Sequence, residues 1–328
     1  MDEQTCRQRL CVGRPVLAAD VIAAIVQRPR RAQTPPLPPP LIAETSFVEV
    51  AGLPTFPLYA DRRATSRPIL LIHSINAAAS AYEMRPIFER FGGRRTVYAL
   101  DLPGFGKAAR PERTYDAGTY VDAIEAALQH IASPDGVDVV VLSLSSEFAA
   151  TAALRRPALV RSLTLISPTG FKRVEDTTPK EAAKQRDAAA KVYGVFRTAN
   201  IGKTLFGVLR TRSSLSFFLG QLFLGPVDAG LIDYNEITTQ QKGAYVAPLA
   251  FVSGVLFNPE IRQDVYAKLA LPVLVLYDKD PFISFDGLRR FADQHPNWTT
   301  TRIEPTRGLP QFEKPGEVVA AIEDFTAA

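Results

Sequence analysis

One run of residues, VDVVVLSLSSEFAATAA at Val137–Ala153, constrains the fold of this chain more than any other. Its first half is apolar and β-branched, the pattern of a strand that is buried on both faces of a parallel sheet. Its second half is rich in alanine, the residue with the highest helix propensity. Only Ser143-Leu144-Ser145-Ser146-Glu147 remains for the turn between them. The run predicts a strand, a tight turn and a helix, with Ser145 either a nucleophile on a sharp elbow or an ordinary turn serine.

Strands and helices alternate over most of the chain after Ser46. The predicted strands are Phe47–Val50, Phe56–Tyr59, Ile69–His73, Val97–Leu102, Val137–Ser143, Ser162–Ser167, Val273–Tyr277 and Thr300–Glu304. The predicted helices outside the insertion described next are Ser80–Phe91, Thr119–Ile131, Ser146–Arg155, Phe285–Gln294 and Gly316–Phe325. Strands separated by helices pair in parallel through right-handed crossovers. The pattern therefore predicts an α/β fold with a mostly parallel eight-stranded sheet flanked by helices, and an antiparallel pair at one edge.

The alternation is interrupted once, between Ser167 and Leu271, by about a hundred residues of helical character. We predict that residues 171–264 form a helical cap on a core made of residues 46–170 and 265–328. Open α/β sheets bind their ligands at the carboxyl ends of the strands. A cap over that edge would enclose a pocket.

Residues 1–45 differ from the rest of the chain and are predicted to form an N-terminal arm. Val16–Gln27 has the apolar spacing of a short helix, and the run PPLPPP at Pro35–Pro40 predicts an extended polyproline spacer. Cys6 and Cys11 are the only cysteines, which is too few for a disulfide framework or a metal site. No metal or cofactor is therefore expected.

Composition excludes several classes of protein. A chain of 328 residues with 46% apolar content can bury a large core, and its net charge of +4 is not gathered into a long Lys/Arg tract. No nucleic-acid-binding motif is present, so nucleic acid is not an expected partner. The sequence has no apolar run long enough for a membrane span, and its polar beginning, MDEQTCRQRL, lacks the apolar core of a secretory signal. We expect a cytoplasmic protein whose partner is a small-molecule substrate.

Four further segments, in this order along the chain, resemble motifs of the α/β-hydrolase superfamily. They are ILLIHS at Ile69–Ser74, DLPGFGK at Asp101–Lys107, LPVLVLYDKDPF at Leu271–Phe282 and LPQFEKP at Leu309–Pro315. In that family such segments begin the oxyanion loop, follow the next strand, carry the acid of the catalytic triad and follow the triad histidine. The resemblance covers the chain from Ser46 to its C-terminus and implies the α/β-hydrolase fold.

The resemblance also implies roles for residues around the turn. Alignment on the family pattern G-x-S-x-G places Ser145 at the nucleophile, with Ser143 and Glu147 at the two glycine positions. The two backbone donors of the oxyanion hole would then be the N–H groups of Ser146 and Ile75.

The resemblance implies a triad that lacks its base. Asp280 falls at the position of the acid, although Asp278 and Asp280 could also form a simple polar turn. The position of the histidine is taken by Gly308, and His130 and His295 come from segments that do not normally face the nucleophile. A serine hydroxyl without an imidazole stays protonated and is a weak nucleophile. The sequence therefore does not encode an ordinary Ser-His-Asp hydrolase.

Two hypotheses address what replaces the histidine. In the first, Arg307 or Lys279 pairs with Asp280, because a buried aspartate without a partner is costly, and the acid has become structural. In the second, Glu147 accepts the proton of Ser145, with a pKa raised by burial.

The predicted cap indicates the class of ligand. Its segment Thr204–Gly225 is rich in apolar and aromatic side chains, which favours a small apolar or acyl-type ligand, although packing within the cap is an alternative reading. The predicted pocket residues are His73, Ser74, Phe206, Phe217 and Phe218, with His73 structural rather than catalytic. Between Phe171 and Arg212, ten Lys/Arg against four Asp/Glu fit either an anionic substrate or a solvated helix face.

These observations predict an α/β-hydrolase-fold enzyme with a non-standard triad that acts on a small apolar or acyl/ester-type substrate. Two alternatives stay open. One is a lyase, cyclase or decarboxylase that uses the same pocket and oxyanion hole, and the other is a catalytically silent ligand-binding protein. Fold alone does not choose among them.

Overall fold

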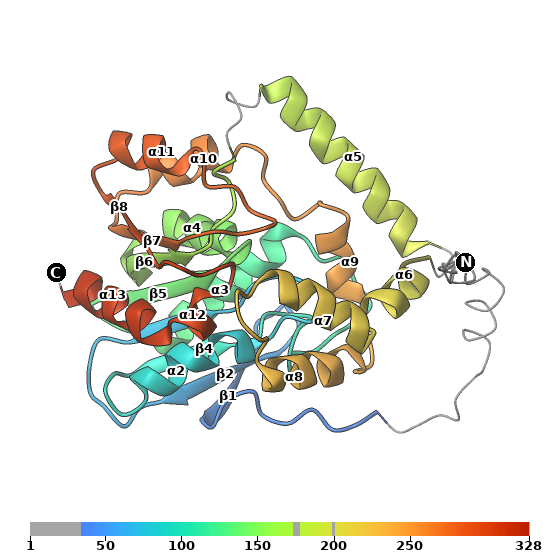
Figure 1. Cartoon of the computed structure of the whole chain (residues 1–328), viewed down its shortest axis with the longest axis horizontal. Coiled ribbons are helices and arrows are strands. Elements are labelled where there is room, and N and C mark those ends of the chain that lie inside the picture. The colour runs from blue at the N-terminus through green and yellow to red at the C-terminus, as the bar shows by residue number, and fades with distance from the viewer. Residues whose placement is uncertain (1–33, 173–177, 199–200, 328) are drawn as a thin grey trace, which may run out of the picture. The chain divides into compact units, whose positions relative to one another are not determined.

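An eight-stranded sheet runs through the centre of the molecule, with the strand order β1-β2-β4-β3-β5-β6-β7-β8 (Figure 1). The structure is a computed structural model that describes residues 34–172, 178–198 and 201–327. Its strands are β1 Glu44–Val48, β2 Phe56–Asp61, β3 Ile69–Ile72, β4 Val97–Leu100, β5 Val137–Leu142, β6 Val160–Ile166, β7 Val273–Tyr277 and β8 Trp298–Arg302.

Helices cover both faces of the sheet and fill the connection between β6 and β7 (Figure 1). Those of the core are η1 Ala81–Met84, α2 Arg85–Phe91, α3 Ala117–Ile131, α4 Ser145–Arg155, η2 Pro157–Leu159, α11 Leu288–Gln294, α12 Pro310–Glu313 and α13 Pro315–Ala327. Those between β6 and β7 are α5 Pro179–Arg197, α6 Ile201–Leu209, α7 Arg212–Gln221, α8 Ala229–Thr239, α9 Val246–Val252, α10 Ile261–Asp264 and η3 Tyr266–Lys268. None of the helices that the structure describes combines the length and apolar character needed to span a bilayer.

Strand direction brings the ends of consecutive strands to one edge. β2 pairs antiparallel with β1 and with β4, and every other pair is parallel. In the parallel register, Ile72 of β3 lies opposite both Leu100 of β4 and Val141 of β5. The residues that follow β3, β4 and β5 therefore meet at the same carboxyl edge, where ligands bind in open α/β sheets.

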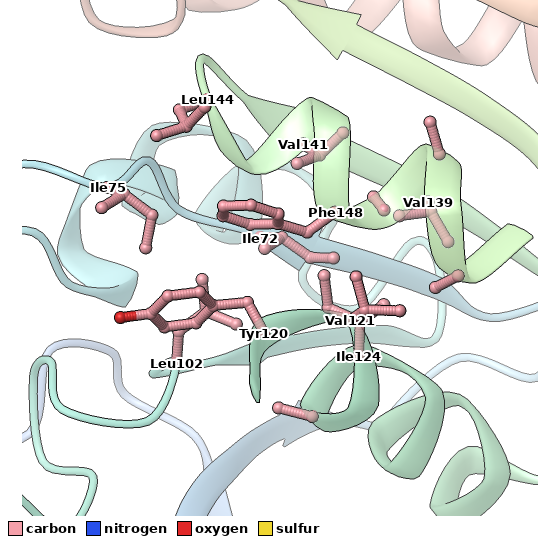
Figure 2. Close-up of a cluster of buried hydrophobic side chains, with 14 of the residues drawn as sticks. Ile72, Ile75, Leu102, Tyr120, Val121, Ile124, Val139, Val141, Leu144 and Phe148 are labelled. Carbon is pink, nitrogen blue, oxygen red and sulfur yellow. The ribbon is translucent and has the colours of Figure 1, made fainter. Parts of the chain in front are cut away.

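The central strand β5 is buried on both faces, as its sequence predicts. Val139 and Val141 belong to the apolar cluster beneath α3 and α4, where Phe148 of α4 stacks on Tyr120 of α3 at a ring distance of 5.1 Å (Figure 2). The alternate residues of β5, Val140 and Leu142, belong to the cluster on the opposite face. Burial of apolar surface on both faces is what fixes the strand in the middle of the sheet.

The predicted fold class is confirmed, and all eight predicted strands are present with boundaries that differ by a few residues. The largest difference is β1, which was expected at Phe47–Val50 and lies at Glu44–Val48. Apolarity misled the prediction here, because Phe47 is 55% exposed on this edge strand. Backbone pairing with β2, from Glu44 opposite Ala60 to Val48 opposite Phe56, sets the strand instead.

The proline-rich segment is not the free spacer that its composition predicts. The carbonyl oxygen of Pro35 accepts a hydrogen bond of 3.0 Å from the Gln241 side chain, and that of Pro38 accepts one of 3.0 Å from the Tyr234 hydroxyl of α8. Pro40 and Leu41 are buried. Extended proline backbone has unpaired carbonyl groups, and here the helical insertion supplies donors for them. The predicted helix Val16–Gln27 and both cysteines lie outside the described residues.

Candidate functional site

A sharp backbone turn lies at Ser143, at the carboxyl edge of the sheet. This residue directly follows β5, has a φ of +56°, and donates its backbone N–H to Ile166 of β6 at 2.8 Å. Leu144 is already in the right-handed helical region, and α4 begins at Ser145. A positive φ is uncommon for a residue with a Cβ and marks strain at a functional turn. Ser143 is partly exposed, as a reactive hydroxyl requires.

Ser145, the predicted nucleophile, is not at this turn. It lies in the first turn of α4, is fully buried, and donates its hydroxyl to the backbone carbonyl of His73 at 2.7 Å. An alignment shifted by two residues places Ser143, rather than Ser145, at the nucleophile position of the family pattern. With the nucleophile placed at Ser143, Ser145 instead takes the second glycine position of G-x-S-x-G, where close packing requires a small residue.

The displacement also changes the expected oxyanion donors. The N–H of Ser146 donates to the Ser143 carbonyl at 3.0 Å, so it is already used. The backbone N–H groups of Leu144 and Ile75 find no acceptor among the described residues. The side chains of Leu144 and Ile75 belong to one buried cluster, which holds both segments in place (Figure 2). Leu144 therefore replaces Ser146 as the candidate donor, and Ile75 stays a candidate.

A buried carboxylate that sequence reasoning missed holds the loop after β3. Glu83 of η1 accepts the Ser74 backbone N–H at 2.9 Å and the Asn76 side-chain amide at 2.7 Å. The same amide nitrogen of Asn76 donates to the Ser74 hydroxyl at 2.8 Å. These bonds fix the backbone on both sides of Ile75. An acidic residue at the start of a predicted helix was the only sequence signal, and it is a common one.

His73 is structural, as the family resemblance implies. Its Nε2 accepts the backbone N–H of Leu102 at 2.9 Å, so its Nδ1 carries the proton and donates to the Ser74 carbonyl at 2.6 Å. The side chain is fully buried. With both ring nitrogens engaged, His73 joins the ends of β3 and β4 and is not available for proton transfer.

The predicted acid, Asp280, lies next to Gly308, the residue at the predicted histidine position. A Cβ added to Gly308 would lie 2.7 Å from Oδ2 of Asp280. The other carboxylate oxygen, Oδ1, accepts the backbone N–H groups of Phe282 at 2.8 Å and Ile283 at 3.0 Å. Burial raises the pKa of Asp280 above its usual range, and the two backbone donors only partly offset this effect.

An apolar side chain fills the space beside Gly308. Cδ2 of Leu222, at the C-terminal end of α7, would lie 2.4 Å from a Cβ at this position. That distance is shorter than any ordinary contact, so Leu222 would have to move before residue 308 could carry an imidazole. In Figure 1, α7 and the segment before α12 lie side by side. The helical insertion therefore supplies what packs against Gly308.

The hypothesis that Arg307 or Lys279 pairs with Asp280 is wrong. Arg307 points elsewhere: its guanidinium donates to the Gln221 carbonyl at 3.1 Å, and its backbone N–H donates to Glu313 at 2.7 Å. Neither cation lies within ion-pair distance of Asp280 in the described part of the chain. Lys279 is exposed, and its charge is better solvated by water than by a partly buried carboxylate.

The neighbouring aspartate holds the structural ion pair instead. Asp278 is buried, and its Oδ1 receives Nε of Arg302 at 2.7 Å. Its Oδ2 accepts the backbone N–H of Thr306 at 2.8 Å. Asp278 therefore anchors the loop that leads to Gly308, while Asp280 has no cation partner among the described residues. Asp278-Lys279-Asp280, the DKD turn, therefore contains two acids with different roles.

No histidine of the chain replaces the missing base. His130 is exposed at the end of α3, just before β5 begins, and His295 follows α11, just before β8 begins. Both are therefore at the amino edge of the sheet, opposite the edge that carries Ser143. His295 also stacks on Phe291 at a ring distance of 4.0 Å and bonds its carbonyl.

Glu147 is buried but does not face Ser145. Its Oε1 accepts the Thr169 hydroxyl at 2.5 Å, and its Oε2 accepts the backbone N–H of Asn258 at 2.8 Å. Burial raises the pKa of Glu147 to about 7, against the lowering effect of both donors. Glu147 thus joins α4 to the loop after β6 and to the helical insertion. Because Ser145 donates to His73, the hypothesis that Glu147 accepts its proton is wrong.

Two of the three aromatic residues predicted to line the pocket face solvent. Phe206 is buried in α6, as expected. Phe217 and Phe218 of α7 are 63% and 45% exposed, because Leu215 and Leu219 form the buried face of that helix. The sequence could not distinguish these faces, since α7 is apolar on both. Within the described ranges, no cluster of three His, Cys, Asp or Glu side chains is arranged to hold a metal ion.

Comparison with known proteins identifies the family and the relatives that this chain resembles. A family model described as the alpha/beta hydrolase family matches residues 69–322. A 2-(acetamidomethylene)succinate hydrolase of Mesorhizobium japonicum is 32% identical over 122 residues, which are 37% of this chain and 43% of that protein. A 1-acylglycerol-3-phosphate O-acyltransferase, ABHD5 of Rattus norvegicus, is 26% identical over 38% of this chain and 36% of its own length. The chain thus spans less than half the length of these curated relatives.

Among solved structures, a serine hydrolase involved in carbazole degradation, the CarC enzyme, is similar to this chain. It superposes with a TM-score of 0.68 and 18% identity over 87% of this chain and 99% of its own. At that identity the likeness concerns the fold.

Proposed function

The chain belongs to the alpha/beta hydrolase family, and we propose that it is an atypical member with Ser143 at the nucleophile position and Gly308 at the position of the triad histidine. The N–H groups of Leu144 and Ile75 form the oxyanion hole, and Asp280 takes the position of the acid. The positive φ of Ser143 supports its placement, because the family nucleophile sits on a strained turn between strand and helix. Glu83 is a positioning residue for the oxyanion loop.

The observation that carries the proposal is the set of neighbours around Gly308. An acid on one side and an apolar side chain on the other enclose a place where serine hydrolases hold an imidazole. A positioned general base contributes roughly 10² to 10⁴ in rate, and loss of a triad member leaves mainly the oxyanion hole and binding. Without the base, the Ser143 hydroxyl stays protonated at neutral pH and forms an acyl-enzyme slowly.

The groups that remain favour chemistry that does not need an activated serine. Two main-chain donors can bind a carbonyl oxygen and stabilise the negative charge that develops on it. The proposed function is therefore that of an α/β-hydrolase-fold enzyme for a small apolar or acyl-type substrate, which promotes lyase, cyclisation or decarboxylation chemistry rather than hydrolysis through an acyl-serine. The names of two relatives, a 2-(acetamidomethylene)succinate hydrolase and a 1-acylglycerol-3-phosphate O-acyltransferase, support an acyl-bearing small molecule.

A second candidate is a ligand-binding protein without catalysis. Leu222 favours it, because an apolar side chain beside Asp280 removes space for a water or a base. The oxyanion-loop network would then orient a bound carbonyl group only. The two candidates share a pocket and differ in turnover.

An activity probe tests the proposal. We expect a fluorophosphonate probe to leave Ser143 essentially unlabelled, as judged by peptide mass spectrometry, in protein whose melting curve shows that it is folded. Prompt labelling of Ser143, absent in Ser143→Ala, would show an activated nucleophile and contradict the proposal. A ligand screen by thermal shift then separates the two candidates: a stabilising ligand that is consumed indicates an enzyme, and one that is recovered unchanged indicates binding alone.

A further inference from the structure

The positive charge of the chain is concentrated in one part of the helical insertion. Residues 188–227 contain five Lys/Arg and no Asp/Glu. The whole chain has 38 Lys/Arg and 34 Asp/Glu, which leaves 33 against 34 in the rest. The excess positive charge of the protein therefore comes entirely from these 40 residues, which we call the basic stretch. Such asymmetry indicates an anionic partner rather than general solubility.

The basic stretch also exposes large apolar side chains. Seven of the fourteen exposed large hydrophobic residues among the described ones lie in it: Val192, Val195, Ile201, Val208, Phe217, Phe218 and Leu224. Ile201 and Val208 are seven residues apart and so share one face of α6. Phe217 and Phe218 contact each other edge to face at 5.4 Å on the exposed side of α7. Exposed apolar groups that contact each other, as Phe217 and Phe218 do, are a feature of binding surfaces.

Four of the five cations form no ion pair with the described residues. Arg212 forms ion pairs of 2.7 Å with Asp233 and Glu236. Lys191, Arg197, Lys203 and Arg210 are exposed and have no carboxylate of the described residues within ion-pair distance. Arg197 donates to the Thr114 hydroxyl, and Lys203 lies over the Tyr245 ring, so both keep their charge. These cations are available to an external anion.

We propose that the exposed face of α6 and α7 docks on an anionic lipid bilayer, with Phe217 and Phe218 inserted at the headgroup level and Lys203 and Arg210 against lipid phosphates and carboxylates. Surface helices that expose aromatic and aliphatic side chains beside Lys/Arg, and that carry no acidic residue, share these features with helices that lie in a membrane interface. An anionic bilayer can bind both the exposed apolar side chains and the cations, since it has an apolar interior and a negatively charged surface. A flat acidic protein surface would satisfy the charge alone.

The basic stretch also contains a residue of the candidate site. Leu222, which packs beside Gly308, comes directly after α7. A bilayer bound to α7 therefore lies one helix away from the proposed pocket and places it near acyl-bearing ligands. The docking proposal does not depend on the proposed function, because vesicle binding and serine labelling are independent measurements.

Vesicle co-sedimentation tests the docking surface. The full chain is mixed with vesicles of phosphatidylcholine alone, or with vesicles that also contain phosphatidylserine, at low and high ionic strength. We expect binding to the phosphatidylserine vesicles that weakens with salt. The double variant Lys203→Gln/Arg210→Gln should bind about thirtyfold more weakly, at about fivefold for each cation lost. Phe217→Ser/Phe218→Ser should lose about tenfold or more on both kinds of vesicle.

Matched variants elsewhere on the surface serve as controls. Arg289→Gln/Arg290→Gln removes two exposed cations of α11, and Ile42→Ser/Phe47→Ser removes two exposed apolar groups near β1. Both should bind vesicles as the unmodified chain does. Absence of binding to phosphatidylserine vesicles, or equal losses in the control variants, would overturn the proposal. A dimer in analytical ultracentrifugation that Phe217→Ser/Phe218→Ser dissociates, without vesicle binding, would assign the face to a second copy and also overturn it.

Discussion

The candidate site has two sides that are built differently: the elbow side, around the turn at Ser143, and the base side, around Gly308. On the elbow side, Ser145, His73 and Glu83 are buried and each has hydrogen-bond partners that fix the backbone. On the base side, Gly308 contributes no side chain, and Asp280 and Leu222 meet around it. The elbow side therefore consists of groups that fix the backbone, whereas the proposed base position carries no side chain that could move a proton.

This difference has a physical reason. An oxyanion hole made of main-chain N–H groups depends on backbone position and tolerates changes of side chain. A general base depends on one side chain, so a single substitution removes it without disturbing the fold. The loop that carries Gly308 stays anchored through Asp278, Arg302 and Thr306. Under the proposed assignment, the base side lacks a proton acceptor while its loop stays anchored.

The largest effect should come from restoring the base. In Gly308→His/Leu222→Ala, the imidazole gains space next to Asp280, and we expect fluorophosphonate labelling of Ser143 to accelerate about a hundredfold or more. Gly308→His alone should gain much less, because Leu222 occupies the space. If the folded double variant labels no faster than the unmodified chain, the two sides of the site do not face each other as proposed.

The next effect concerns stability against pH. The pKa of Glu147 is about 7 in the folded chain and near 4.5 when unfolded, so the unfolded state loses its proton first as pH rises. The free energy of unfolding should fall by about 3 kcal/mol between these pH values from this group alone. In Glu147→Gln that fall should disappear, because glutamine does not titrate. The glutamine can still bond Thr169 and Asn258. Urea titrations at several pH values measure it, with the exposed Glu49→Gln as control; parallel curves for Glu147→Gln and the unmodified chain would contradict this account.

A smaller effect distinguishes the two acids of the DKD turn. Asp278→Asn should destabilise the chain by about 1–2 kcal/mol, because the amide cannot accept from both Arg302 and the Thr306 N–H. Asp280→Asn should cost nothing or stabilise at neutral pH, since burial raises the pKa of Asp280 and disfavours its charged form. Chemical denaturation measures the free energy of unfolding of both variants. The reverse order would mean that Asp280, not Asp278, anchors the loop.

The smallest effect separates two serines on the elbow side. Ser145→Ala leaves the buried His73 carbonyl without its donor and should cost about 1 kcal/mol, whereas the partly exposed Ser143→Ala should leave stability unchanged. Introduced into Gly308→His/Leu222→Ala, Ser143→Ala should abolish labelling and Ser145→Ala should retain it. Thermal melts measure stability, and probe labelling measures reactivity. Loss of labelling in the Ser145→Ala variant would indicate Ser145 as the nucleophile and contradict the proposal.

Much of this architecture could be predicted from the sequence. Buried strands such as β5 are apolar throughout, and the order of strands and helices is specific to the fold. The nucleophile position was harder, because the turn has serines at positions 143, 145 and 146 and lacks the glycines that would set the register. The missed signal was the end of the strand: β5 ends at Leu142, and the proposed nucleophile, Ser143, follows it directly.

Contacts between distant segments could not be predicted at all. Nothing in the sequence places Leu222 beside Gly308, since the two are joined only through the packing of the helical insertion on the core. The partners of Arg307 and Glu147 likewise depend on three-dimensional neighbours such as Gln221 and Asn258. The sequence predicts Gly308 at the histidine position, and the structure gives the neighbours of Gly308, Leu222 and Asp280.

The central claim is that Ser143 lacks an activating base, and pre-steady-state acylation measures this most directly. A short-chain p-nitrophenyl ester in excess over the protein is followed for a burst of nitrophenol, and the protein is then analysed by intact mass. The account predicts no burst and no acyl adduct at neutral pH. A stoichiometric burst with an acyl group mapped to Ser143 would contradict it.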